Sequence, residues 1–174
     1  MYGIENEQTH ETKEKVRQSK LKKGRGLLLS FYEFNQELRI PRLIRAMKMG
    51  FRVALVSDAG TPTISDPGFK LTAKAHSEGI AVEALPGPCA VTTALSASGF
   101  PAESFCFLGY LPKVNSEKTA LVIRASKLGQ TTVFYDSPNR IAKSLAVISE
   151  IMGPEHVVFL GVELTKMHET HFRG

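Results

Sequence analysis

The sequence contains little of what several common protein classes require. Among its 174 residues there is no tryptophan, there are two cysteines, and 8% of the residues are aromatic. Two cysteines are too few for a disulfide scaffold or a four-cysteine zinc site. Cys89 and Cys106 stand among apolar neighbours, which predicts reduced, buried thiols. No apolar run reaches the ~18 residues of a membrane-spanning helix, so an integral membrane protein is excluded.

Charge is unevenly distributed along the chain. There are 22 Lys and Arg against 17 Asp and Glu, a net charge of +5, and much of the surplus lies in residues 1–25. Such a balance permits a nucleic-acid partner, although a solvated basic helix explains the first segment equally well. That segment lacks the apolar core of a secretory signal and carries several acidic residues, which predicts a cytoplasmic protein and leaves an organelle open.

From residue 27 onward, short apolar runs alternate with amphipathic segments. Strands are predicted at 27–32, 52–57, 80–85, 105–110, 131–136 and 156–162. Helices are predicted at 9–23, 37–49, 69–78, 89–98, 117–128 and 139–152. This alternation predicts an α/β protein with mostly parallel sheets. The expected organisation is a polar leader (1–26), a first α/β domain (27–112) and a second α/β domain (113–174).

The loop at 57–68 has an unusual composition. It contains two glycines, two prolines, two acidic residues and four hydroxyl side chains directly after a predicted strand. Ligands bind at the carboxyl ends of parallel strands, so we interpret it as a ligand loop. Gly60 would let the backbone approach a ligand, and Asp58 could accept from a ribose hydroxyl or an amine. Ser65 or Asp66 is expected to cap the following helix.

A second loop, Pro86-Gly87-Pro88, comes before small residues at a predicted helix start, Cys89 and Ala90. Small side chains leave room for a ligand and expose helix N–H groups, but they also suit close packing of a helix on a sheet. Neither a Gly-x-Gly-x-x-Gly fingerprint nor a Walker phosphate loop is found in the sequence. The histidines lack metal-ligand spacing, so no metal is expected.

Several motifs in one order carry a resemblance to a known family. They are Val53–Pro62, Asp66–Gly68 and Leu85–Ala90, supported by Ser30–Asn35 before Ile40-Pro41, by Gly109–Pro112, by Phe134–Arg140, and by Glu163–Lys166 with Glu169. This pattern resembles the small-subunit rRNA cytidine 2′-O-methyltransferases, a branch of the tetrapyrrole-methylase-like enzymes that use S-adenosylmethionine (SAM).

The resemblance implies a tetrapyrrole-methylase-like fold of two α/β domains, with SAM in the cleft between them. It implies SAM contacts from Asp58, Ala59, Gly60, Pro62, Ile64, Cys89, Ala90, Tyr110 and Tyr135. It also implies a homodimer and small-subunit rRNA as partner. The family begins with a further strand and a glycine loop and continues past residue 174. The chain is therefore expected to be shortened at both ends, with an incomplete first domain.

Methyl transfer to a ribose hydroxyl needs alignment of the reacting atoms and help in removing a proton. We expect Glu163 and Lys166 to be catalytic, with Glu169 and Asp58 as other candidates for the base. Arg140 is expected to contact RNA phosphate, against an alternative capping or ion-pair role. Tyr110 and Tyr135 fit base stacking and aromatic core equally. The alternative functions are an inactive or regulatory relative, a tetrapyrrole methylase, and an α/β interaction module.

Overall fold

The computed structural model describes residues 2–5 and 27–174 of the chain. These fall into two compact units, Met1–Pro88 and Cys89–Gly174, which we describe one at a time. The predicted leader helix at 9–23 lies outside the described residues. The predicted domain boundary at residue 112 stays a prediction.

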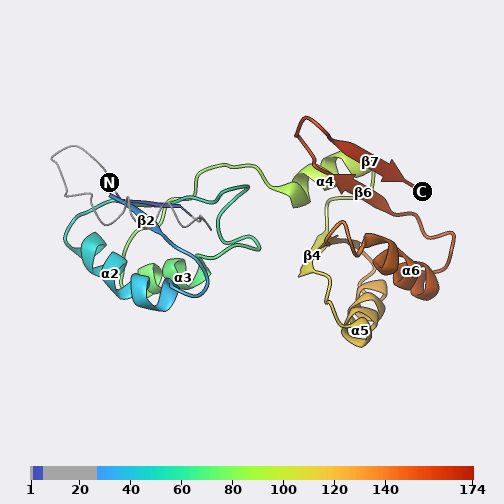
Figure 1. Ribbon diagram of the computed structural model, residues 1–174, viewed down its shortest axis with the longest axis horizontal. Helices are drawn as coiled ribbons and strands as arrows, with labels where there is room; N and C mark the ends of the chain where they lie inside the picture. Colours follow the sequence, from blue (N-terminus) through green and yellow to red (C-terminus); the bar gives the residue numbers. More distant parts are fainter. Residues whose placement is uncertain (1, 6–26) are drawn as a thin grey trace. The chain divides into compact units, whose positions relative to one another are not determined.

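The first unit is built on a three-stranded parallel sheet (Figure 1). Its strand order is β2 (Leu27–Ser30), β1 (Tyr2–Glu5), β3 (Val53–Leu55), with Ile4 opposite both Leu29 and Leu55. Strand β1 was not predicted and lies in the segment assigned to the polar leader. Four residues that include a glycine and a glutamate give no apolar run, so only the neighbouring strands reveal this strand.

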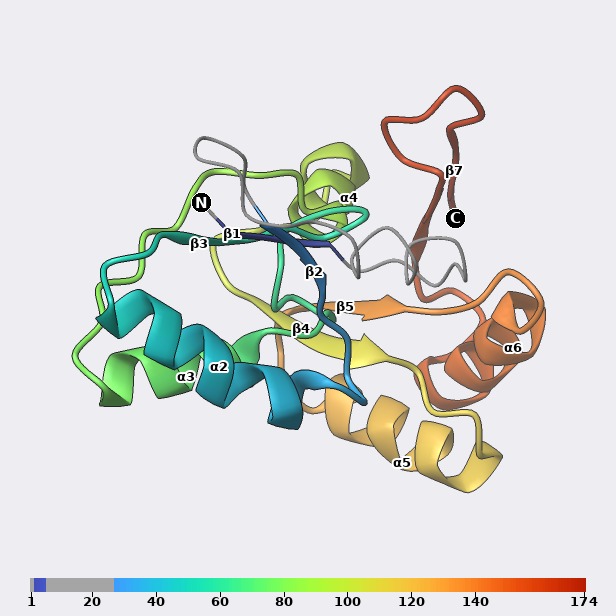
Figure 2. The same ribbon diagram turned by 60° about the vertical axis from the view of Figure 1, so that its left-hand side comes forward.

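Two helices, α2 (Gln36–Lys48) and α3 (Phe69–Ser77), lie side by side along the sheet in both views (Figure 1, Figure 2). Apolar residues at helical spacing make one face of α2 suitable for burial. The core of this unit joins strand and helix residues: Leu29, Phe31, Ile40, Leu43, Ile44, Leu71 and Ala75. The turn into α2 is fixed by Asn35, whose side chain accepts from Tyr32 N at 2.9 Å and donates to Ser30 O at 3.2 Å.

The third strand predicted in this unit, at 80–85, is wrong. These residues form an extended, mostly exposed segment between α3 and Pro88, and Leu85 is 82% exposed. A strand exists through its ladder of backbone hydrogen bonds to a neighbour. Within the described residues no strand pairs with 80–85, so the apolar pattern alone does not make a strand there.

The second unit contains three helices and four strands. In chain order they are α4 (Ala90–Ser98), β4 (Phe105–Tyr110), α5 (Asn115–Ser126), β5 (Thr131–Tyr135), α6 (Ile141–Met152), β6 (Phe159–Val162) and β7 (Thr170–Arg173). Strands β4 and β5 pair in parallel, whereas β6 and β7 pair antiparallel. The core clusters around Leu111, Val122 and Val147, between α5 and α6.

The α/β class with mostly parallel pairing is confirmed, and nearly all predicted elements from residue 27 on are observed with shifted ends. The strand predicted at 80–85 is the exception. Strand β7 is observed but was not predicted, because Thr170–Arg173 carries only one large apolar residue. Of the helices that the structure describes, none has the length and apolarity to cross a membrane.

A pair of lysines links α2 and α3 through one carboxylate. Lys48 Nζ lies 2.5 Å and Lys74 Nζ 2.6 Å from the carboxylate oxygens of Glu78. Hydrogen bonds from Lys48 and Lys74 lower the pKa of the Glu78 carboxyl from its usual 4.5 to about 2. The charged form is therefore favoured by the folded state.

The Glu78→Gln variant should be less stable than the wild type at pH 7, with a melting temperature lower by on the order of 2 °C because the pair is at the surface. A lowered pKa stabilises the fold above about 4.5, and that contribution disappears as the pH falls from 4.5 to about 2. Thermal unfolding from pH 7 to pH 2 checks this. The exposed Glu83→Gln is the control, and a gap between Glu78→Gln and wild type that does not shrink with pH contradicts the assignment.

Candidate functional site

The loop between β3 and α3 presents all five residues predicted from the first motif. Asp58, Ala59, Gly60 and Ile64 are exposed and Pro62 is half-buried. The carboxylate of Asp58 has neither a hydrogen-bond nor an ion-pair partner among residues 27–174. This stretch of chain therefore offers an acidic group and small side chains to a ligand.

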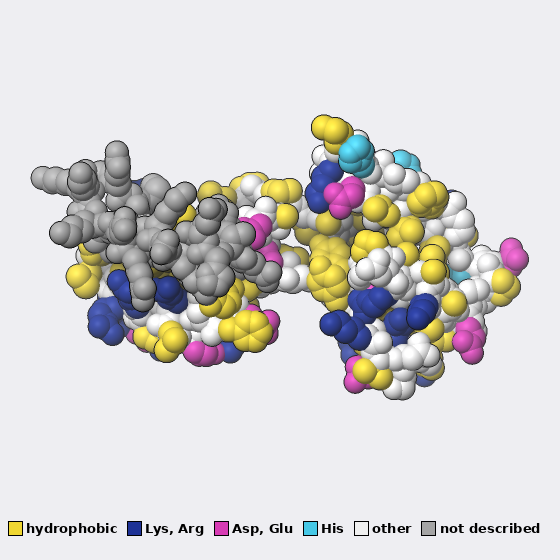
Figure 3. Space-filling view, in the orientation of Figure 1, with side chains coloured by type: hydrophobic (Ala, Val, Ile, Leu, Met, Phe, Trp, Pro, Cys, Tyr) yellow, Lys and Arg dark blue, Asp and Glu magenta, His cyan; other side chains and the backbone are white. Residues whose placement is uncertain are grey.

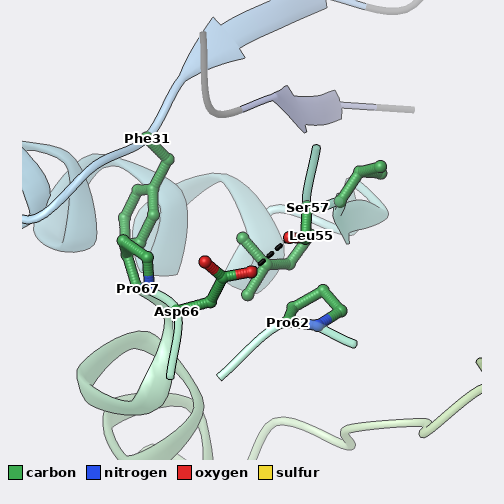
Figure 4. A pocket seen from close by; sticks show the side chains of 7 residues that line it. Phe31, Leu55, Ser57, Pro62, Asp66 and Pro67 are labelled. Carbon is green, nitrogen blue, oxygen red and sulfur yellow. Dashed lines mark hydrogen bonds between the residues drawn. The ribbon is translucent and has the colours of Figure 1, made fainter. Parts of the chain in front are cut away.

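An internal hydrogen bond closes this loop. The Ser57 hydroxyl lies against both the Asp66 carboxylate and Ala59 O, the latter at 3.0 Å (Figure 4). Phe31 and Pro67 line the same small cavity, whose volume of about 10 Å³ leaves room for a water molecule at most. The predicted capping of α3 by Ser65 or Asp66 is wrong, since Gly68 is the N-cap residue without a side-chain bond. Asp66 instead ties the two ends of the loop together.

The path of the loop demands unusual backbone angles. Thr63 and Ser65 have φ of 75° and 59°, in the left-handed region that non-glycine residues rarely adopt. Gly68 has φ of 132°, and a Cβ there would lie 2.5 Å from Leu55 Cδ2. Such angles persist only where surrounding contacts hold them. The Ser57–Asp66 contact and the packing of Gly68 on Leu55 provide that restraint.

The two sequence motifs of this unit meet directly. Thr61 Oγ1 donates to Pro88 O at 2.9 Å, which ties the first loop to the Pro86-Gly87-Pro88 turn. A Cβ on Gly87 would lie 3.2 Å from Thr61 Oγ1, tighter than an ordinary contact. Gly60, with φ of 83°, places its own Cβ position 3.6 Å from Pro88 O. The glycines thus allow two loops to come together at one place.

In the second unit, Cys89 is the N-cap residue of α4 and Ala90 is its first residue. Cys89 O accepts from the Thr93 amide at 3.0 Å and from the hydroxyls of Thr93 and Thr92 at 2.9 and 3.1 Å. The two threonine hydroxyls are therefore already used in hydrogen bonds to the first turn of α4. Both Cys89 and Cys106 are free thiols, but they are half-buried, so the predicted full burial is wrong.

Tyr110 and Tyr135 lie opposite each other at the ends of β4 and β5. Their ring centroids are 5.3 Å apart in an edge-on arrangement, and Phe107 lies 4.8 Å from Tyr135. Tyr110 is 61% exposed while Tyr135 is half-buried. Tyr135 therefore belongs to an aromatic cluster, and base stacking by either tyrosine stays a prediction.

Arg140 is held inside the second unit. Its guanidinium pairs with Asp136 and donates to Leu111 O at 3.2 Å. The Asp136 side chain is only 4% exposed and also accepts from Ser144 Oγ at 2.5 Å and from Ser137 N at 2.8 Å. The ion-pair role given as the alternative for Arg140 is therefore present. Its contact with RNA stays a prediction.

The predicted catalytic residues lie on the turn between β6 and β7. Lys166 Nζ is 2.9 Å from a carboxylate oxygen of Glu163, and both side chains are exposed. Glu163 and Thr165 have positive φ of 50° and 65°. Glu169 accepts from Thr165 N at 2.6 Å and so supports the strained turn. The arrangement presents a carboxylate beside an ammonium group at the surface.

The residues that hold these loops, chiefly Thr61, Asp66 and Asp136, were not predicted to do so from the sequence. Only Asp136 left a readable signal, a carboxylate four residues before Arg140 at a helix start. Contacts such as Thr61–Pro88 join residues 27 positions apart, and no local pattern predicts them. A search of the described part of the chain finds no three His, Cys, Asp or Glu residues arranged to hold a metal ion.

Comparison with known proteins first defines the class. A solved structure of the methyltransferase CobJ shares the fold, with a TM-score of 0.64 over 99% of this chain and 74% of that chain, at 20% identity. The class is therefore the methylase fold of two α/β units. The profile of the tetrapyrrole (corrin/porphyrin) methylases matches residues 5–174, and the chain belongs to this family.

Proteins named ribosomal RNA small subunit methyltransferase I are similar in sequence. The Vibrio cholerae protein is 43% identical over 81% of this chain and 49% of its own length. Those of a Hydrogenobaculum species and Thermotoga maritima are 47% and 44% identical over 84% of this chain, and 63% and 65% of their own lengths. The predicted resemblance is confirmed. The chain spans about half to two thirds of the length of these relatives.

Thr61→Val keeps the size of the side chain but removes the hydroxyl that holds Pro88. We expect faster hydrogen exchange in residues 58–64 and 84–87, by about fivefold, as the loss of one hydrogen bond of ~1 kcal/mol implies. Thr72→Val is the matched control, because its hydroxyl bonds only to Gly68 O at 3.2 Å within the same helix. Unchanged exchange in Thr61→Val would show that the tie does not hold the loop.

Proposed function

We propose that the protein is a SAM-dependent methyltransferase that methylates a ribose 2′-hydroxyl of a cytidine in small-subunit rRNA. The observation that carries the proposal is the identity of 43–47% to small subunit rRNA methyltransferases over more than 80% of the chain. Rigid loops at the strand ends support it, since parallel α/β proteins bind ligands there. The proposed substrate places the protein in the cytoplasm, where small subunits are assembled, and the resemblance adds a homodimer.

The residues of the first loop fit SAM. Asp58 has an unpartnered, exposed carboxylate suited to ribose hydroxyls or to the amino group of SAM. Gly60 has no side chain beside Pro88 O, so a ligand can approach the backbone. Ala59, Pro62 and Ile64 add apolar surface, and we assign Cys89, Ala90, Tyr110 and Tyr135 as further contacts from the second unit. When bound, SAM would supply an electrophilic methyl group on a sulfonium.

The turn between β6 and β7 supplies groups for the proton transfer. We propose that the Glu163 carboxylate accepts the proton of the attacking 2′-hydroxyl, because a carboxylate can accept hydrogen bonds whereas a protonated lysine cannot. Lys166, at 2.9 Å from Glu163, orients that carboxylate and faces the anionic RNA backbone. The ribose oxygen would bond to the methyl carbon as the bond from that carbon to the sulfur of SAM breaks, which leaves a neutral thioether, and the hydroxyl proton would pass to Glu163.

A tetrapyrrole methylase is the second candidate, since the matching family is described by corrin and porphyrin substrates. A shortened, inactive or regulatory relative and an α/β interaction module are further readings. Transfer of labelled methyl from SAM to naked rRNA, to the assembled small subunit and to a porphyrinoid distinguishes them. Methylation of rRNA alone supports the proposal, and methylation of the porphyrinoid alone overturns it. Binding of SAM without any transfer indicates the regulatory relative.

Gly60→Val should weaken SAM binding at least a hundredfold while the far-UV circular dichroism stays unchanged. With φ of 83° at this position, a β-branched residue forces the loop onto another path. Gly79→Val is the control, because Gly79 has a similar φ of 69° at the exposed end of α3 and open space around its Cβ position. Isothermal titration calorimetry measures the affinity, and wild-type binding by Gly60→Val rejects the loop assignment.

Glu163→Gln should lower the rate of methyl transfer about a hundredfold, since a general base contributes factors of this size. SAM affinity should stay at the wild-type value, because the change removes a proton acceptor and leaves the first loop intact. Glu155→Gln, which alters an exposed carboxylate before β6, is the control. A Glu163→Gln protein with wild-type turnover would assign the base elsewhere.

A further inference from the structure

Four arginines are concentrated on α2 and the residues just after it. They are Arg39, Arg42, Arg45 and Arg52, and all except the half-buried Arg39 are exposed. A spacing of three residues puts Arg39, Arg42 and Arg45 along one flank of the helix, each about 4.5 Å further along its axis. This flank lies beside the face that carries Ile40, Leu43 and Ile44 into the core.

The positive charges of this unit divide into two sets. Within residues 27–88 each lysine is paired: Lys48 and Lys74 with Glu78, and Lys70 with Glu37 at 2.5 Å. None of the four arginines has an ion pair or a side-chain hydrogen bond with any residue in 27–174. Over residues 27–88 basic and acidic residues are nearly balanced, seven against six, so the arginine cluster reflects segregation of charge within the unit.

The surface view shows the lysine and arginine side chains of this unit in one colour (Figure 3). Dark blue side chains gather over α2 on the face shown, with little magenta among them (Figure 3). Arginine keeps its charge at all physiological pH values, and its planar fork matches the oxygens of a phosphate group. Exposed cations without protein partners are available to polyanions, and most protein contacts to nucleic acids are made to phosphates.

We propose that Arg42, Arg45 and Arg52 form an arginine stripe that binds the phosphate backbone of the substrate RNA. The inference rests on the proposed function, to which it adds a surface for the RNA distinct from the SAM loop. Contacts to phosphates position the RNA without reading its sequence, so other residues would select the nucleotide that is methylated. Exposed Leu38 on α2 and exposed Met49 at its C-cap also allow a membrane as partner, and the test separates the membrane from RNA.

The experiment compares two double variants of the full chain that remove the same charge. Arg42→Gln with Arg45→Gln alters the stripe, and Lys48→Gln with Lys70→Gln removes two paired lysines of the same unit. Binding of in vitro transcribed small-subunit rRNA is measured by filter binding between 50 and 300 mM salt. SAM affinity, by calorimetry, and far-UV circular dichroism are recorded for each protein, together with binding to phosphatidylserine vesicles.

We expect the arginine variant to bind RNA about tenfold more weakly at 100 mM salt. The slope of log affinity against log salt should fall by about one to two, because fewer counterions are released. The lysine variant should stay within about twofold of wild type, and SAM affinity should be unchanged in both. Equal losses in the two variants, or wild-type binding by the arginine variant, would overturn the proposal. So would arginine-dependent binding to vesicles with none to RNA.

The two proposals can fail separately. If the wild type transfers methyl to rRNA while the arginine variant binds RNA normally, the stripe is wrong and the function stands. If RNA binding depends on the stripe but no methyl is transferred to RNA, the stripe stands and the proposed reaction is wrong.

Discussion

The contact between the Ser57 hydroxyl and the Asp66 carboxylate is the constraint on which the first unit's ligand loop depends. Holding a loop of this length in one conformation costs about 1–2 kcal/mol per residue in backbone entropy. Pro62 and Pro67 lower that cost by restricting the unfolded chain. The Ser57–Asp66 and Thr61–Pro88 hydrogen bonds and the packing of Gly68 against Leu55 offset the remaining entropy cost. A ligand therefore meets a loop that is already ordered, which reduces the entropy lost on binding.

In the second unit too, an aspartate after a parallel strand accepts from a serine hydroxyl and holds the chain that follows the strand. After β5, Asp136 accepts from Ser144 and pairs with Arg140, as Asp66 accepts from Ser57 after β3. The Asp136 side chain is only 4% exposed, and a buried carboxylate is costly unless its charge is paired and hydrogen-bonded. Arg140 supplies the opposite charge and at the same time holds the carbonyl of Leu111. The end of β5 and the chain leaving β4 are thus fixed to each other.

The sequence predicted those parts of the structure that repeat locally. Helical spacing located α2, α3, α5 and α6, and short apolar runs located β2 to β6. The failures share a cause. Ile80–Leu85 has the composition of a strand but no strand among the described residues pairs with it, whereas β1 and β7 pair with neighbouring strands but lack that composition. The site divides in the same way. Loop composition predicts a ligand loop at 57–68, and its contact with a ligand stays a prediction. The tie from Thr61 to Pro88 could not be predicted in this way, because it depends on the fold of the whole unit.

The turn between β6 and β7, which carries the proposed proton acceptor Glu163, has a strained backbone that neighbouring residues hold in place. Glu163 and Thr165 adopt left-handed backbone angles that a free hairpin would relax. Strand β7 cannot slide to release them, because Arg173 donates to Ser98 O at 3.0 Å and stacks on Phe100. Just before β7, the Glu169 carboxylate accepts from Thr165 N at 2.6 Å. These contacts, all made by residues in or next to β7, hold the turn against its backbone strain, and the Lys166–Glu163 ion pair keeps the two side chains together at the surface.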